Sequence, residues 1–327
     1  MYVVTGGAGF IGSNVVAALA DRGAEVVVVD WLRRDERWHN IAKHEIVSLI
    51  APEDLPAWLQ RNGGSIEAMI HMGAVSTTTE TDVDLIVTNN VRTTLSLLDW
   101  CREEKVRLIY ASSAATYGAG TDGFDDAVGC EALARLRPLN AYGWSKHVVD
   151  RRIARLAALG SSLPPQWVGL KFFNVYGPNE YHKGSMQSVI AKNYAQIMKA
   201  EPMRLFRSHV PTYADGGQLR DFIYVQDCVD VILWLLDNRQ VSGLFNLGTG
   251  NARTWLDLAT ALFRAAGQPA AIEFVEMPPA LRGNYQYFTE ARMSRLRSVG
   301  YDRPFTSLEE GISSYVRNYL ATDDPYR

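Results

Sequence analysis

The sequence predicts an α/β fold in which a doubly wound parallel sheet is joined to a smaller C-terminal α/β lobe. Three observations predict it. Short apolar runs recur along the chain, helix-periodic stretches separate them, and a glycine-rich turn links the first run to the first helix. Strands that alternate with helices form parallel sheets, and ligands bind such sheets at the carboxyl ends of the strands. A glycine turn in this position is typical of a Rossmann-type domain.

Composition and charge narrow the class of protein. The chain has 327 residues, 47% hydrophobic and 21% charged, with a net charge of −3, which favours neither a nucleic-acid nor a membrane partner. Its three cysteines, Cys101, Cys130 and Cys228, show no metal-binding or disulfide spacing. An apolar strand begins at once, and no run reaches membrane-spanning length. We therefore expect a cytoplasmic protein without a metal site.

The first strand, turn and helix lie in the segment YVVTGGAGFIGSNVVAALADRGAEVVVVD, residues 2–30. Its glycines are spaced G-x-x-G-x-x-G between a strand and a helix. Such a turn lets backbone N–H groups approach a pyrophosphate, and the positive helix N-terminus attracts it. The segment predicts a dinucleotide site formed by Gly6, Gly9, Phe10, Ile11 and Gly12.

The residues at the end of the second predicted strand should determine whether NAD or NADP binds. Asp30, followed by Trp31, stands about twenty residues after the turn, where an acid holds the adenosine ribose hydroxyls. Arg33, Arg34 and Arg37 follow and could neutralise a 2′-phosphate, or could be solvated loop residues. The acid favours NAD and the arginines favour NADP. We predict tightly bound NADP, with NAD as the second choice.

Further apolar runs continue the alternation, and helix-periodic stretches such as 89–104 separate them. We expect strands within 68–74, 106–113, 167–175 and 243–250. This order predicts a cofactor-binding domain from residues 1–175 plus 221–250. The smaller substrate lobe would comprise 176–220 plus 251–327.

Three polar residues in the first domain form a candidate catalytic group. Tyr142 and Lys146 lie four residues apart, hence on one helix face, and Ser113 ends a predicted strand. A lysine beside a phenol lowers the phenol's pKa, which would make Tyr142 an acid or base near neutrality. Ser113 could hydrogen-bond the same substrate hydroxyl.

Five motifs together resemble the extended short-chain dehydrogenase/reductase family: TGGAGFIG (5–12), SSAATYG (112–118), YGWSK (142–146), FNVYGP (173–178) and RDFIYVQD (220–227). The resemblance implies hydride transfer between a sugar-nucleotide carbinol and the nicotinamide. Ser113 and Tyr142 would polarise and deprotonate the hydroxyl, and Lys146 would bind the nicotinamide ribose. It also implies further cofactor contacts from Met72, Gly73, Ala74, Ser76, Asn89, Val175 and Lys183.

One motif separates reaction types within the family. Dehydratases carry Thr-Asp-Glu where this chain has Ser113, Ala114 and Ala115. Without that acid pair, dehydration is disfavoured, and epimerisation or simple oxidoreduction remains.

The segment NVYGPNEYHKGSM (174–186) resembles one branch of the family, the sugar-nucleotide 6-epimerases that act on ADP-heptose. That resemblance implies inversion of the heptose C6 through a ketone on retained NADP, for lipopolysaccharide core synthesis, and suggests a homo-oligomer. Lys183 would be a second acid/base with a depressed pKa, whereas His182 would only hydrogen-bond. The implied substrate contacts are Asn174, Ser185, Lys192, Phe206, Arg220 and Tyr285.

Departures from that branch keep two alternatives open. The stretch 205–222 is longer than expected, and Lys192 replaces a histidine. These differences leave room for another epimerase or ketoreductase acting on UDP- or GDP-sugars. A non-catalytic NAD(P)-binding sensor is disfavoured, because such proteins usually lose the tyrosine or the lysine of the catalytic group.

Overall fold

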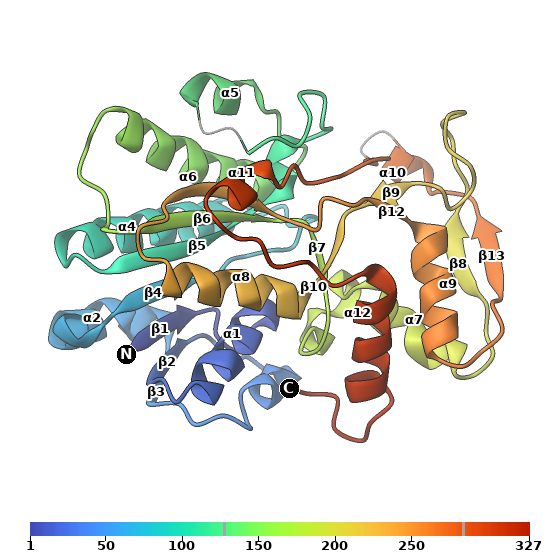
Figure 1. Cartoon of the computed structure of the whole chain (residues 1–327), viewed down its shortest axis with the longest axis horizontal. Coiled ribbons are helices and arrows are strands. Elements are labelled where there is room, and N and C mark those ends of the chain that lie inside the picture. Colours follow the sequence, from blue (N-terminus) through green and yellow to red (C-terminus); the bar gives the residue numbers. More distant parts are fainter. Residues whose placement is uncertain (127–128, 283–284) are drawn as a thin grey trace.

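A computed structural model describes residues 1–126, 129–282 and 285–327. Gly283 and Asn284, which fall in the predicted substrate lobe, lie outside this description. Figure 1 shows a large sheet layered between helices on the left and a smaller group of helices and strands on the right. Within the described residues, no helix combines the length and the apolar character needed to cross a bilayer.

The large sheet has seven strands, all paired in parallel, in the order β11-β6-β5-β4-β1-β2-β3. Its bounds are β1 Tyr2–Thr5, β2 Val26–Val29, β3 Ser48–Ile50, β4 Ala68–His71, β5 Arg107–Ser113, β6 Trp167–Phe172 and β11 Gly243–Leu247. The four consecutive valines of β2 are all buried, as expected for β-branched residues in a sheet covered on both faces. The predicted doubly wound fold is confirmed.

Helices cover the two faces of this sheet. On one face α1 (Phe10–Asp21) packs against α8 (Val225–Asp237), and on the other α6 (Ala141–Ala158) contacts α5 (Cys130–Arg135) and the π-helical turn η4 (Val87–Arg92). Near these lie α2 (Leu55–Asn62), α3 (Val83–Ile86), α4 (Thr93–Glu103) and α11 (Ser294–Ser298). The 3₁₀ turns are η1 Glu36–Asn40, η2 Pro52–Asp54, η3 Gly63–Ser65, η5 Ala114–Tyr117 and η6 Tyr181–Met186.

A second hydrophobic core lies beside the first, among the elements on the right of Figure 1. Ile190, Met203, Leu262 and Ile312 are among its fully buried residues. It is built from α7 (Val189–Ile197), β8 (Met203–Phe206), α9 (Trp255–Ala265), β13 (Ile272–Val275), α12 (Leu308–Tyr315) and the π turn η7 (Val316–Leu320). The remaining short helix is α10 (Pro279–Arg282).

The chain crosses between the two cores more often than expected. Ala291, Leu296 and Tyr301 pack in the first core, although they follow the second-core elements in sequence. Conversely, Phe222 and Tyr224 belong to the second core. The two-part domain division therefore stays a prediction, because each of these two segments packs in the core from which the division separates it.

The strand expected over 167–175 is two strands, so that expectation is corrected. After β6 the chain turns at Phe173, whose N–H still bonds to Leu247. Residues Asn174–Tyr176 form β7, which leaves the large sheet and pairs in parallel with β10 (Phe222–Tyr224). Arg220 lies in the adjacent β9 (Leu219–Arg220), which pairs with β12 (Arg253–Thr254). The split places the motifs FNVYGP (173–178) and RDFIYVQD (220–227) side by side, because β7 pairs with β10.

Candidate active site

The glycine turn is packed too tightly for side chains. Gly6 has φ +64°, and a Cβ on it would lie 2.6 Å from the Gly73 nitrogen. A Cβ on Gly12 would lie 2.0 Å from the Gly6 carbonyl oxygen. No side chain caps α1, whose N-cap is Gly9. The first N–H groups of α1 thus remain available to an anion, which is the geometry a pyrophosphate requires.

Asp30 lies at the carboxyl end of β2 with its acceptors already oriented. Its carboxylate accepts hydrogen bonds from the backbone N–H groups of Ala8, at 3.0 Å, and Trp31, at 2.8 Å. Burial raises the pKa of Asp30, and the guanidinium of Arg37, 3.7 Å away, opposes the rise. The carboxylate faces the cleft beyond the glycine turn, where it can accept ribose hydroxyls.

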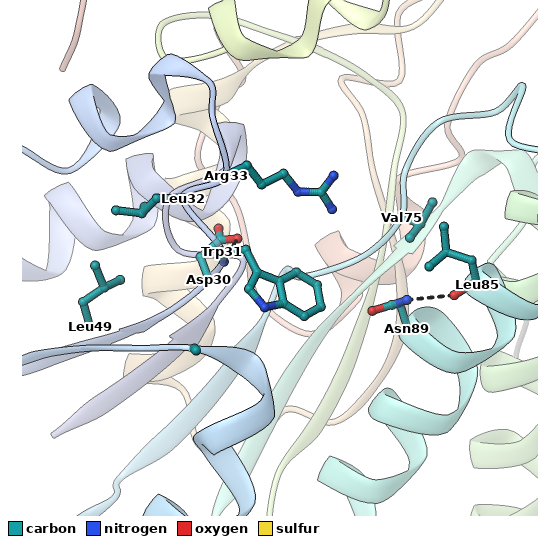
Figure 2. Close-up of a pocket in the computed structure, with 9 residues that line it drawn as sticks. Asp30, Trp31, Leu32, Arg33, Leu49, Val75, Leu85 and Asn89 are labelled. Carbon is teal, nitrogen blue, oxygen red and sulfur yellow. Dashed lines mark hydrogen bonds between the residues drawn. The ribbon is translucent and has the colours of Figure 1, made fainter.

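A cavity of about 670 Å³ opens beside Asp30 (Figure 2). Trp31 and Arg33 reach into it from one side, and Asn89 borders it from the other, its amide donating to Leu85 O at 2.8 Å. The full lining is Asp30, Trp31, Leu32, Arg33, Leu49, Ala51, Val75, Leu85 and Asn89. Of the apolar members only Trp31 was predicted from the sequence. The short strand β3, which ends between Leu49 and Ala51, could have indicated two of them.

Arg37, predicted to bind the cofactor, is held within its own loop. Its guanidinium makes two hydrogen bonds to Asp35, at 2.8 and 2.7 Å, which lower the pKa of that carboxyl. Arg33 differs, because it is exposed, lines the cavity and lies 6.0 Å from the centre of the Trp31 ring. Of the two, Arg33 is the better placed to meet a phosphate.

The catalytic group is assembled at the carboxyl end of β5. The side chain of Asn140 caps α6 through the Gly143 N–H, at 2.8 Å. Tyr142 follows in the first turn and hydrogen-bonds Ser113. Burial nevertheless raises the pKa of Tyr142. The expected lowering by Lys146 is therefore wrong for this structure, because desolvation of the phenol outweighs any neighbouring charge.

Lys146 is almost fully buried one turn further along α6. Burial lowers its pKa to about 8, and Asp150 opposes that effect. His71 stays neutral nearby, since burial and Lys146 lower its pKa to about 3. The His71 ring bonds Thr5 at 2.6 Å and Thr94 at 2.9 Å. Lys146 therefore faces a neutral ring on β4 and an acid on its own helix.

Asn90, which was not predicted, links this group to the segment that follows β4. Its amide oxygen accepts the Val75 N–H at 2.8 Å, and its NH₂ donates to Val75 O at 2.9 Å and Ser145 Oγ at 3.1 Å. It sits in the π turn η4. Two consecutive asparagines within a helix-periodic stretch were the available signal, and the prediction named only Asn89.

Lys183 lies on η6, over the first residue of α1. Its ammonium is 5.1 Å from the centre of the Phe10 ring. Burial lowers the pKa of Lys183, Lys192 adds to this and Glu180 opposes it, so the predicted direction is confirmed. Neighbouring His182 contacts the Asn40 amide at 3.3 Å.

Arg220 and Tyr285, predicted as substrate contacts, lie together. The Arg220 guanidinium is 5.0 Å from the centre of the Tyr285 ring and 5.9 Å from that of Trp255. Phe206 meets Tyr285 edge to face. Arg220 is only 7% exposed, and burial lowers its pKa. No carboxylate pairs with it among the described residues, which makes it a cation ready for an anionic ligand.

The other predicted residues lie in three places. Met72 and Gly73 bond Thr5 through their N–H groups and thereby adjoin the glycine turn, with Ala74 and Ser76 next in the chain. Lys192 donates to the Ser185 carbonyl near Lys183. Asn174 and Val175 lie on β7, beside β10.

A family model matches residues 2–248, the span that includes the glycine turn and the catalytic group; its description is the NAD dependent epimerase/dehydratase family. The chain belongs to that family. The resemblance drawn from the motifs is thereby confirmed, and so is a nicotinamide cofactor, which the glycine cradle, the open start of α1 and the Asp30 carboxylate fit.

Named relatives extend the match over the whole chain. The chain is 51% identical to an ADP-L-glycero-D-manno-heptose-6-epimerase of Nitratidesulfovibrio vulgaris, with 100% of both sequences covered. It is similar to the crystal structure of the Helicobacter pylori enzyme of that name, with a TM-score of 0.79 and 27% identity over 97% of this chain and 95% of that one. A Thermus thermophilus UDP-glucose 4-epimerase solved with NAD is 27% identical, with a TM-score of 0.72 over 95% and 96%.

Proposed function

We propose that this chain inverts C6 of the heptose in ADP-D-glycero-β-D-manno-heptose to give ADP-L-glycero-β-D-manno-heptose, a lipopolysaccharide core precursor. The observation that carries the proposal is the 51% identity to a heptose 6-epimerase over the full length of both chains. The alternative of a non-catalytic sensor is disfavoured, because the Ser113–Tyr142 contact and the buried Lys146 are intact.

The oxidation half of the reaction would use the group on β5 and α6. The bound nicotinamide supplies hydride acceptance from C6 and hydride return. Tyr142, hydrogen-bonded to Ser113, takes the proton of the C6 hydroxyl as the ketone forms. Lys146, charged below about pH 8, would hold the nicotinamide ribose.

Inversion requires proton transfer at two orientations of the same hydroxyl. One tyrosine cannot serve both orientations without moving, so a second acid/base is useful, and we assign that role to Lys183. Its lowered pKa raises the neutral fraction that a base needs. Tyr142 lies on α6 and Lys183 on η6, so the two groups come from different elements.

The nucleotide end of the substrate would bind beside β9 and the elements that form the second core. Arg220 would pair with the diphosphate, with the ring of Tyr285 stacked beside its guanidinium. Phe206, Ser185, Lys192 and Asn174 complete the proposed substrate surface. In this scheme the cofactor binds along the large sheet and the nucleotide sugar binds beside the smaller group of elements. A homo-oligomer stays a prediction.

We further propose that the cofactor is NADP, tightly bound and recycled. Arg33 supports this choice, because it lines the cavity next to Asp30 and its charge is not used in an ion pair among the described residues. A guanidinium there can meet a 2′-phosphate and offset the repulsion from Asp30.

The decisive experiment incubates the purified protein with ADP-heptose and with GDP- and UDP-sugars, and follows C6 and C4 by proton NMR. Inversion at C6 of ADP-heptose alone is expected. Turnover of a UDP- or GDP-sugar instead would favour the alternative left open by the long 205–222 stretch. There Arg207 and His209 contact Glu276 at 3.7 and 3.4 Å.

A further inference from the structure

A fully buried ion pair lies one helical turn beyond Lys146. Lys171 Nζ is 2.7 Å from the Asp150 carboxylate, and both residues are 0% exposed. Replacing such a pair by well-packed apolar residues is often neutral or stabilising, so stability alone explains it poorly. Its place beneath the catalytic helix points to a role in the reaction.

Hydrogen bonds connect the pair to the strand end that carries Ser113. Ser112 Oγ donates to Asp150 at 2.7 Å. Lys171 donates to Thr116 Oγ1, also at 2.7 Å, and the Thr116 hydroxyl donates to the Ser113 carbonyl at 2.8 Å. The network therefore holds the residue before Ser113, through the Ser112 hydroxyl, and the Ser113 carbonyl, through Thr116. It also links this strand end to α6, which carries Tyr142.

Both charges of the pair also act on titratable groups of α6. Burial lowers the pKa of Lys146 and Asp150 opposes that effect, whereas burial and Lys171 lower the pKa of His147 and Asp150 opposes them. Because Asp150 lies four residues after Lys146 on one helix, the two side chains share a face of α6.

We propose that the Asp150–Lys171 pair is a positioning element for catalysis, in which Asp150 keeps Lys146 in its charged form while the network holds Ser113 against Tyr142. Neither residue needs to touch substrate. The proposal rests on the epimerase function for its activity readout.

Burial is the largest influence on the pKa of Lys146, and Asp150 is the charged group that opposes it. His71, from β4, is held neutral by its two threonine partners and its low pKa. Burial raises the pKa of Tyr110, on β5, and of Tyr117, on η5, so both phenols stay neutral as well. The Lys171 ammonium lies 4.9 Å from the centre of the Tyr117 ring.

The test compares Asp150→Asn, Lys171→Met and the double variant by kcat as a function of pH. Loss of the acid should move the upper limb of the profile to lower pH, by about 1 unit, because Lys146 then loses its proton more easily. Loss of Lys171 should move it to higher pH, because Asp150 is no longer compensated. Removing one partner of a buried pair leaves an unpaired buried charge and is strongly destabilising, so the double variant, which has none, is the arm least prone to misfold. It should behave like Asp150→Asn.

A matched control breaks a different ion pair, at the opposite end of β5 from Ser113. Arg107, at the start of β5, is 2.8 Å from Glu67, and Glu67→Gln should leave both limbs unchanged. Equal losses of kcat in all the pair variants, with an unmoved upper limb, would reduce Asp150 and Lys171 to structural residues and overturn the proposal.

A second readout does not depend on turnover. NMR of protein labelled with ¹³C-lysine, with Lys146→Met to assign the signal, follows the titration of Lys146 directly. Opposite displacements of that titration in Asp150→Asn and Lys171→Met are expected, and identical titrations would overturn the proposal. A parent protein that turns over no nucleotide sugar but shows these displacements would refute the epimerase function and support the charge relationship.

Discussion

The Lys183 ammonium lies 5.1 Å from the centre of the Phe10 ring, over the first residue of α1. That end of the helix is also where an anion binds. The position therefore admits two roles for Lys183, a base at C6 or a cation that pairs with a diphosphate. Kinetics separate them, because loss of an acid/base lowers kcat whereas loss of ground-state binding raises KM.

We expect Lys183→Met and Tyr142→Phe each to lower kcat for C6 epimerisation by about 10² to 10⁴. Tyr142→Phe should retain bound cofactor, because Tyr142 makes no contact with the glycine turn, whereas the cofactor content of Lys183→Met is measured beside its kcat, because Lys183 lies over Phe10 of that turn. Lys199→Met, at an exposed lysine just beyond α7, is the control and should match the parent. A raised KM with near-parental kcat in Lys183→Met would assign the lysine to diphosphate binding.

Cofactor choice should depend on Arg33. Arg33→Ala is expected to weaken NADP binding by roughly 10-fold, the typical loss of a hydrogen bond to a charged group, and to leave NAD binding unchanged. The nucleotide that stays with the protein through gel filtration can be identified by chromatography after denaturation. Arg37→Ala is the comparison, because Asp35 already holds that guanidinium. Equal losses of NAD and NADP in Arg33→Ala would contradict the assignment.

Arg220 should affect ligand binding and stability in opposite directions. Its guanidinium is buried without a carboxylate partner among the described residues, so Arg220→Met should keep or raise the Tm of the protein without nucleotide. ADP should then raise the Tm of the parent and not of the variant. Thermal unfolding with and without ADP measures both effects. The same ADP-induced rise in both proteins would place the diphosphate elsewhere.

The glycine turn gives a steric prediction. Gly12→Ala puts a Cβ 2.0 Å from the Gly6 carbonyl oxygen, which forces the turn apart. The variant should lose bound cofactor and unfold at a lower temperature. Gly64→Ala is the control, because a Cβ there meets nothing within 4 Å. Cofactor content by absorbance after purification tests the pair, and full retention in Gly12→Ala would show that the turn relaxes.

Asp227 should make stability fall as pH rises from about 4 to 6. Burial raises the pKa of Asp227 from 3.8 to about 6, although both carboxylate oxygens accept hydrogen bonds from Thr306. A folded-state pKa above the unfolded one means that the protonated folded state is favoured. The contribution is full below the unfolded pKa and lost above pH 6. It amounts to about 3 kcal/mol at most, at 1.36 kcal/mol per unit.

Urea unfolding of the parent and of Asp227→Asn across pH 4 to 7 measures that contribution. The difference between the two free energies of unfolding should change with pH over this window. Asp237→Asn, at the exposed end of α8 where the carboxylate pairs with the exposed Arg22, is the control. A constant difference between parent and Asp227→Asn would show that Asp227 does not titrate there.

Local patterns in the sequence determined the fold class and the centre of the site. The glycine spacing needs only a turn and a helix start, and the four-residue step from Tyr142 to Lys146 needs only one helix. Apolar strands alternating with helices define a parallel sheet in the same local way. These features depend on neighbours in the chain, so periodicity and residue type suffice to predict them.

Only the tertiary structure decided which polar groups are used and with what charge. Contacts between residues distant in sequence place Arg220 beside the aromatic ring of Tyr285. They also place Asn90 between Val75 and Ser145. Burial reverses the expected direction of the Tyr142 pKa. Desolvation and long-range contacts arise when separate elements pack together, and no local pattern encodes how far each side chain is removed from water.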